Sequence, residues 1–154
     1  MNQKRRETLK AGAGLLALLA AAGIISPGEA HAADWNKAAF EGKTMQDALK
    51  ALGASGPANS TDIVIRAADI AENGAVVPVG VESKIPGTQS ISILIDKNPS
   101  ALAASFDIPA GTDPLITTRV KMGQTSDVYA LVKANGKFFV AKKEIKVTLG
   151  GCGG

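Results

Sequence analysis

The sequence predicts a mainly β protein, an immunoglobulin-like antiparallel β-sandwich with a short N-terminal helical segment and a flexible C-terminal arm. After residue 62, short stretches rich in β-branched residues alternate with turn signals. Asn135-Gly136 lies between two such stretches and is the strongest of these signals, because both positions of a hairpin turn need positive φ. The other turn signals are Pro86-Gly87, Asn98-Pro99 and Asp113-Pro114.

Residues 1–32 have the organisation of an export signal. Lys4-Arg5-Arg6 is a basic start, Leu15 to Ile25 is an apolar run too short to span a membrane as a mature anchor, and Ala30-His31-Ala32 has the form of a cleavage site. We expect cleavage after Ala32, which leaves one domain over residues 33–149 and no membrane insertion after processing.

The segment Arg5-Arg6-Glu7-Thr8-Leu9-Lys10 resembles the twin-arginine export signal. Thr8 stands where phenylalanine is usual, and an ordinary secretory signal with two basic residues is the alternative. The twin-arginine route predicts a periplasmic protein. This route carries folded cargo, so a partner without its own signal could travel with the chain.

Two short helices are expected at the start of the domain. Asp34 can cap a helix that runs through Phe40, and Thr44 with Asp47 fits a capping box for a second helix that ends at Gly53. Apolar residues fall at helical spacing in the second segment, and Trp35 and Phe40 are expected to pack the first on the sheet. The apolar positions are Met45, Ala48, Leu49 and Leu52. Residues 54–60 are predicted to be a linker of small residues.

About seven strands are expected after the linker. Pro78 suggests an edge or a bulge, because proline cannot donate to a ladder. In the last strand, apolar residues share one face from Phe139 to Leu149, and Lys143 alone breaks this set, at a bulge or an edge. The clearest strand segments are 63–65, 75–81, 90–95, 115–122, 128–132 and 138–147.

The composition excludes several classes of function. The single histidine, His31, leaves with the signal, and one cysteine remains, so the chain has no Ser-His-Asp or Cys-His catalytic unit, cysteine/histidine zinc site, histidine-ligated haem or internal disulfide. The signal also removes four of 17 basic and two of 14 acidic residues, which leaves a net charge of +1. We therefore expect no self-sufficient enzyme, no cofactor and no nucleic-acid binding.

The most informative motif is Gly150-Gly151-Cys152-Gly153-Gly154. A structural cysteine is normally buried, whereas four glycines without Cβ atoms would hold Cys152 on a thin, mobile arm. From Leu149 to Cys152 the chain can span roughly 10 Å. We predict that residues 150–154 carry a sulfur nucleophile into the active sites of other proteins.

Other interpretations of the tail and the surface stay open. Cys152 could form only intermolecular disulfides in a secreted protein-binding module, and Gly153-Gly154 could be the end of a ubiquitin-like sulfur carrier. Three aromatic residues and three lysines have either an interface role or an ordinary structural role, and three aspartates beside turn signals are predicted to be turn residues. These residues are Tyr129, Phe138 and Phe139; Lys142, Lys143 and Lys146; and Asp96, Asp107 and Asp113.

With its Gly-Gly-Cys-Gly-Gly tail, its leader and the segment Val79-Gly80-Val81-Glu82-Ser83, the chain resembles the SoxY family of bacterial thiosulfate oxidation. The resemblance implies that Cys152 holds thiosulfate through its outer sulfur as an S-thiosulfonate, with all intermediates on the same cysteine. It also implies a heterodimer with a SoxZ-like subunit. The enzymes implied are a haem cytochrome complex that attaches thiosulfate, a hydrolase that releases sulfate and, where present, a sulfane dehydrogenase.

Overall fold

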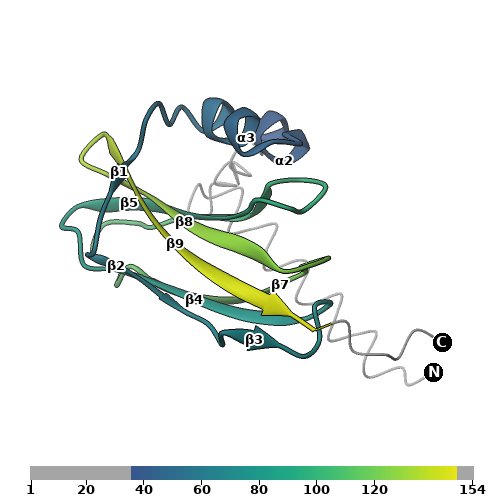
Figure 1. Ribbon diagram of the computed structural model, residues 1–154. Helices are drawn as coiled ribbons and strands as arrows, with labels where there is room; N and C mark the ends of the chain where they lie inside the picture. Colours follow the sequence, from purple (N-terminus) through teal and green to yellow (C-terminus); the bar gives the residue numbers. More distant parts are fainter. Residues whose placement is uncertain (1–35, 149–154) are drawn as a thin grey trace, which may run out of the picture. The chain divides into compact units, whose positions relative to one another are not determined.

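The computed structural model describes residues 36–148, in which two helices precede nine strands (Figure 1). The helices are α2 (Lys37–Glu41) and α3 (Met45–Ala51). The strands are β1 (Ala58–Asn59), β2 (Ile63–Arg66), β3 (Ile70–Ala71), β4 (Val77–Ser83), β5 (Thr88–Ile95), β6 (Leu102–Asp107), β7 (Leu115–Val120), β8 (Ser126–Ala134) and β9 (Lys137–Val147).

The strands form two sheets. The larger sheet has the order β1-β9-β8-β5-β6, with β3 also paired to β9, and the smaller sheet has the order β2-β4-β7. The pairings are antiparallel except those of β1 and β3, which run parallel to the outer edge of β9. The mainly β sandwich predicted from the sequence is confirmed, and the two short parallel pairings are an addition to it.

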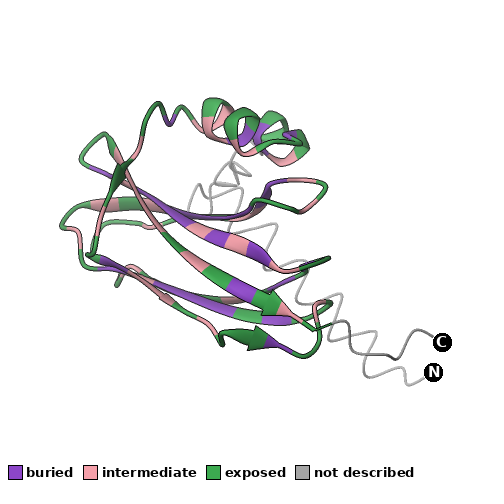
Figure 2. Cartoon of the chain, viewed as in Figure 1, coloured by how far each residue is buried: buried purple, intermediate pink, exposed green. Residues whose placement is uncertain are grey.

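The larger sheet is covered on both faces (Figures 1 and 2). Alternate residues of β5 and β4, such as Ile93 and Val79, fill the space between the sheets. On the opposite face, Leu94 and Leu131 pack with Ala39 and Ala48 of the helices. Because both faces of the sheet are covered, residues 91–95 of β5 are buried without interruption.

The helix signals identified in the sequence are largely confirmed. The Thr44 hydroxyl accepts a hydrogen bond from the Asp47 backbone N–H at 3.1 Å and donates to the Asp47 carboxylate at 2.7 Å, and Gly53 follows the C-cap with a φ of 74°. The start predicted for the first helix is wrong. Asn36 caps α2, because its side-chain oxygen accepts from the Ala39 backbone N–H at 3.1 Å. Asp34 and Trp35 lie outside the described residues.

The strand predictions succeed where the local pattern is strong. Asn135 and Gly136 form the tight hairpin turn, with φ values of 50° and 73°. Strand β2 pairs with β4 only as far as Gly80. Pro78 therefore lies in the part of β4 that is bonded only to β7. Three strands were missed: β1 and β3 have two residues each, and β6 has the sequence Leu-Ala-Ala-Ser-Phe-Asp, whose propensity for strand is low.

A pair of isoleucines tests this description of the core. Ile93→Ala should lower the free energy of unfolding by about 2–5 kcal/mol, because Ile93 is fully buried between the sheets and truncation leaves a cavity. Ile70→Ala is the matched control: Ile70 is 55% exposed, so its change should be within about 0.5 kcal/mol. Urea unfolding of both variants measures the difference, and equal losses would contradict the assignment of the core.

Candidate functional site

The described part of the candidate site is the root of the C-terminal tail. Cys152 and Gly150, Gly151, Gly153 and Gly154 lie outside the described residues, as does the predicted signal. The structure describes the chain up to Thr148, the residue after β9 and four positions before Cys152. The geometry around residues 143–148 therefore defines where the tail begins and how firmly its base is held.

On the outer edge of β9, strand β3 holds the root. Ile70 and Ala71 pair with Lys146 and Val147 in parallel register. The backbone N–H of Lys146 donates to the Asp69 carbonyl at 2.9 Å, and that of Thr148 donates to the Ala71 carbonyl at 3.1 Å. The hydrogen-bonded structure thus continues to Thr148.

The opposite edge of β9 is held as well. Ile145 pairs with Ser126 of β8, and the Val147 backbone N–H donates to the Thr125 hydroxyl at 3.0 Å. The Gly74 carbonyl accepts from the Met122 backbone N–H at 2.7 Å, which brings the loop after β3 against the loop between β7 and β8. The end of β9 lies between these partners, so its position is set from both sides.

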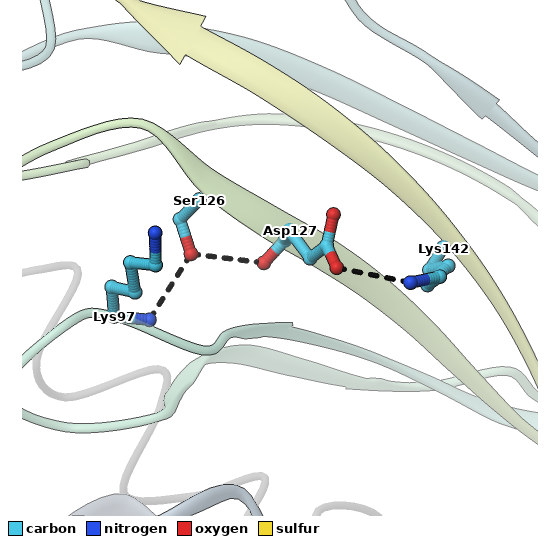
Figure 3. Close-up of polar contacts among 4 residues, drawn as sticks. All are labelled: Lys97, Ser126, Asp127 and Lys142. Atoms are coloured by element: carbon cyan, nitrogen blue, oxygen red, sulfur yellow. Dashed lines mark hydrogen bonds and ion pairs between the residues drawn. The ribbon is translucent and has the colours of Figure 1, made fainter.

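A chain of polar contacts fastens the turn after β5 to β8 and β9 at the same end of the sheet (Figure 3). The buried Ser126 hydroxyl accepts from the Lys97 backbone N–H at 3.0 Å and donates to the Asp127 carbonyl at 3.2 Å. The Asp127 carboxylate then accepts from the Lys142 ammonium at 3.1 Å. These contacts make the end of the sandwich at the tail root a connected frame.

Lys143 explains the one break in the apolar face of β9. Its ammonium is 2.9 Å from the Asp69 carboxylate and also donates to the Ala67 carbonyl. Neither β1 nor β3 pairs with residues 141–145 of β9 on this edge, so Lys143 fills the gap between the two short strands. The sequence predicted that Lys143 lies at a bulge or at an edge. Because the register between β8 and β9 is continuous, there is no bulge, and Lys143 lies at the edge of the sheet.

Several of the other residues singled out in the sequence have structural partners. The ammonium of Lys142 is paired with Asp127, whose hydrogen bond and charge raise the pKa of Lys142. Tyr129, Phe138 and Phe40 pack in the cluster beneath the helices, whereas Phe139 packs against the core between the sheets. Burial is the main cause that raises the pKa of Tyr129. The turn prediction is confirmed for Asp96, while Asp113 lies in the loop before β7 and Asp107 ends β6.

Within residues 36–148, no group of three or more cysteine, histidine or acidic side chains could hold a metal ion. No helix in this part of the chain is long and apolar enough to cross a bilayer. Surface depressions are present, and one of about 330 Å³ lies beside the tail root, lined by Ile70, Val76 and Pro78 among others.

Comparisons with known proteins decide the family. Residues 48–152 match the family described as sulfur oxidation protein SoxY. The chain belongs to the SoxY family. The solved structure of the sulfur carrier protein SoxY from Chlorobium limicola f thiosulfatophilum is 42% identical, covers 69% of this chain and 97% of its own, and superposes with a TM-score of 0.63. This SoxY chain is therefore a sulfur carrier protein of sulfur oxidation and not an enzyme.

More distant matches add nothing to this assignment. An engineered protein of known structure is 14% identical over 56% of this chain and 20% of its own, with a TM-score of 0.41, which is too low to support an argument. No curated protein matches the chain significantly. The relationship thus rests on the family match and the Chlorobium SoxY structure.

Sequence reasoning missed the residues that hold the root. Asp69, Ile70 and Ala71 carry no strand signal, because a two-residue strand has no detectable period. Nothing in the sequence marks Gly74 as closely packed, although a Cβ there would lie 2.3 Å from the Met122 carbonyl oxygen and 2.8 Å from Val147 Cγ1. Lys143 was the only visible signal, as a charged residue on an apolar face.

Replacement of Gly74 tests whether the root is closely packed. Gly74→Ala should lower the free energy of unfolding by about 1–3 kcal/mol, because its methyl group would force the loop or the end of β9 to move. Gly123→Ala is the control from the neighbouring loop: a Cβ there meets nothing within 4 Å, so little change is expected. Urea unfolding gives both values, and a neutral Gly74→Ala would show that the root is loosely packed.

The Lys143–Asp69 pair makes a separate prediction about pH. The hydrogen bond from Lys143, followed by its charge, holds the pKa of the Asp69 carboxyl below its ordinary value. A lowered carboxyl pKa stabilises the fold above the ordinary aspartate pKa, and this contribution is lost as the pH falls through the lowered value. Lys143→Met should raise the Asp69 pKa towards normal in an NMR titration. Lys142→Met, which removes the partner of Asp127, should leave the Asp69 pKa unchanged.

Proposed function

We propose that Cys152 is the covalent attachment point of this sulfur carrier and that Gly150, Gly151, Gly153 and Gly154 make the slender arm around it. The supporting observation is the juxtaposition of a firmly bonded root at Thr148 with the single cysteine of the chain four residues later. The family match also extends to residue 152. A fixed base and a narrow tail without side chains suit the entry of one sulfur atom into a deep pocket.

The chemistry proposed for Cys152 balances with partners that supply the oxidant. The thiol joins the outer sulfur of thiosulfate to give a cysteine S-thiosulfonate. This step releases one proton to the solvent and passes two electrons to the haem of a cytochrome complex. Water then cleaves the terminal sulfonate as sulfate, which leaves a persulfide on Cys152. A free cysteine has a pKa of about 8.5, so most of the thiol is protonated and unreactive between encounters at neutral pH.

We further propose that the chain is exported through the twin-arginine route, loses residues 1–32 and works in the periplasm. The support is the Arg5-Arg6 motif, the apolar run and the small-residue site before Ala33. A folded chain exported in this way could carry a bound SoxZ-like subunit with it. The heterodimer, the cytochrome complex, the sulfate-releasing hydrolase and a sulfane dehydrogenase are the partners that membership of the family suggests.

The Cys152→Ser variant tests the attachment point. The full chain, incubated with thiosulfate and the oxidising cytochrome complex, should gain the mass of bound thiosulfate, and Cys152→Ser should gain nothing. Because Cys152 follows the last described strand by five residues, we expect its replacement to leave the free energy of unfolding within about 0.5 kcal/mol. Loss of folding in the variant would show that the cysteine is structural.

An intact-mass measurement of protein isolated from its native cells reports both the removal of residues 1–32 and the sulfur bound to Cys152. A chain that begins at Ala33 supports export with cleavage, whereas a full-length cytoplasmic chain contradicts it. Treatment with a thiol reductant should remove the added sulfur from the C-terminal peptide. If the cysteine is found only in disulfide-linked dimers, even with the oxidising partners present, the binding-module alternative would replace the carrier chemistry at Cys152.

A further inference from the structure

Two of the most exposed large apolar side chains lie at the tail root. Within residues 36–148, Ile70 is 55% exposed, Val76 is 50% exposed and Leu115 is 53% exposed. Ile70 belongs to β3, which holds β9, and Val76 precedes β4 at the same end of the sandwich (Figure 1). Leu115 begins β7 and pairs with Glu82, near the opposite end of β4. Single exposed apolar residues are ordinary, but a pair beside a functional tail needs an explanation.

Ile70, Val76 and the exposed Pro78 form what we call the root patch. They line the depression of about 330 Å³ beside β3. The fold does not need the Ile70 side chain for its core, because its neighbour Ala71 is the residue of β3 that is buried. The root patch therefore adds apolar surface that folding leaves uncovered.

Some of the charges around the root patch are paired within the chain, whereas those of Glu72 and Lys146 have no ion pair with another described residue. Lys143 is bound to Asp69, and Arg66, at the edge of the depression, is bound to Glu82. Ion pairs of this kind reduce the field that a distant charged partner would experience. The side chains of the root patch itself are apolar, and they complement an apolar surface on a partner.

The length of the tail fixes what can cover the root patch. Cys152 is four residue steps beyond Thr148, so the two Cα atoms can be no more than about 14 Å apart. Ala71 is hydrogen-bonded to Thr148, and neighbouring strands are about 4.8 Å apart. An enzyme that receives the Cys152 sulfur below its own surface therefore comes close to the root, and β3 is one of the elements that it meets there.

We propose that the root patch is the docking surface for the apolar rim around the active-site entrance of an enzyme that acts on Cys152. This inference rests on the proposed carrier role of Cys152 and extends it to the surface that recognises the enzyme. The patch binds the rim equally before and during the reaction, because it lies outside the pocket in which the sulfur reacts. Its loss should therefore raise KM for the carrier and leave kcat unchanged.

The test compares the double variant Ile70→Ser/Val76→Ser with the control Leu115→Ser in the full chain together with its partner subunit. The rate at which the cytochrome complex attaches thiosulfate is measured by intact mass over a range of carrier concentrations. Loss of two apolar contacts should raise KM about tenfold in the double variant with kcat within about twofold, while Leu115→Ser should behave as the unsubstituted chain. The rate of Cys152 alkylation by iodoacetamide should be the same in all three proteins, which shows that the tail is equally accessible.

The outcomes distinguish the docking surface from the carrier role. A double variant with the same KM as Leu115→Ser overturns the root patch as a docking surface and leaves the carrier role standing. A fall in kcat without a change in KM also overturns it, because the patch would then act within the reaction. If the unsubstituted chain itself gains no thiosulfate, the proposed role of Cys152 fails, and the docking surface fails with it.

Discussion

The outer edge of β9 is the constraint on which the rest of this structure depends. A sheet edge leaves backbone N–H and C=O groups unpaired, and β9 has its open edge where the tail leaves the domain. The chain closes this edge with two short parallel strands and one lysine: β1 at Phe139 and Val140, Lys143 in the middle, and β3 at Lys146 and Val147. The contacts that close the edge of β9 also hold residues 146–148 in place.

The layers of the domain decide which surfaces remain free for partners. Helices α2 and α3 occupy the outer face of the larger sheet, and the smaller sheet occupies the inner face. The sheet that contains β9 is thus covered on both faces. The end of the sandwich near β3 keeps apolar side chains on its surface, and this is the surface to which we assign the docking of an enzyme.

The sequence was informative where the structure is set by local chemistry. Thr44 caps a helix and Asn135-Gly136 makes a hairpin because each satisfies a backbone requirement within a few residues. Lys143 could be recognised as an anomaly but not explained, since its partner Asp69 is distant in the sequence. β6, β3 and the tight contact of Gly74 depend on neighbours that only the folded chain supplies. For the candidate site, the sequence predicted the cysteine and its glycines, which lie outside the described residues, and it could not foresee the contacts that hold residues 143–148.

The pairing of β3 with β9 also affects how the chain folds. The contacts of Lys143 with Ala67 and of Thr148 with Ala71 join residues 76 and 77 positions apart, and β9 is the last of the described strands in chain order. Contacts of such long range form slowly, and the larger sheet lacks the strand that connects β8 to β1 and β3 until β9 has been added. The edge that fixes Thr148 is therefore expected to close late in folding, after the hairpin of β8 and β9 has formed.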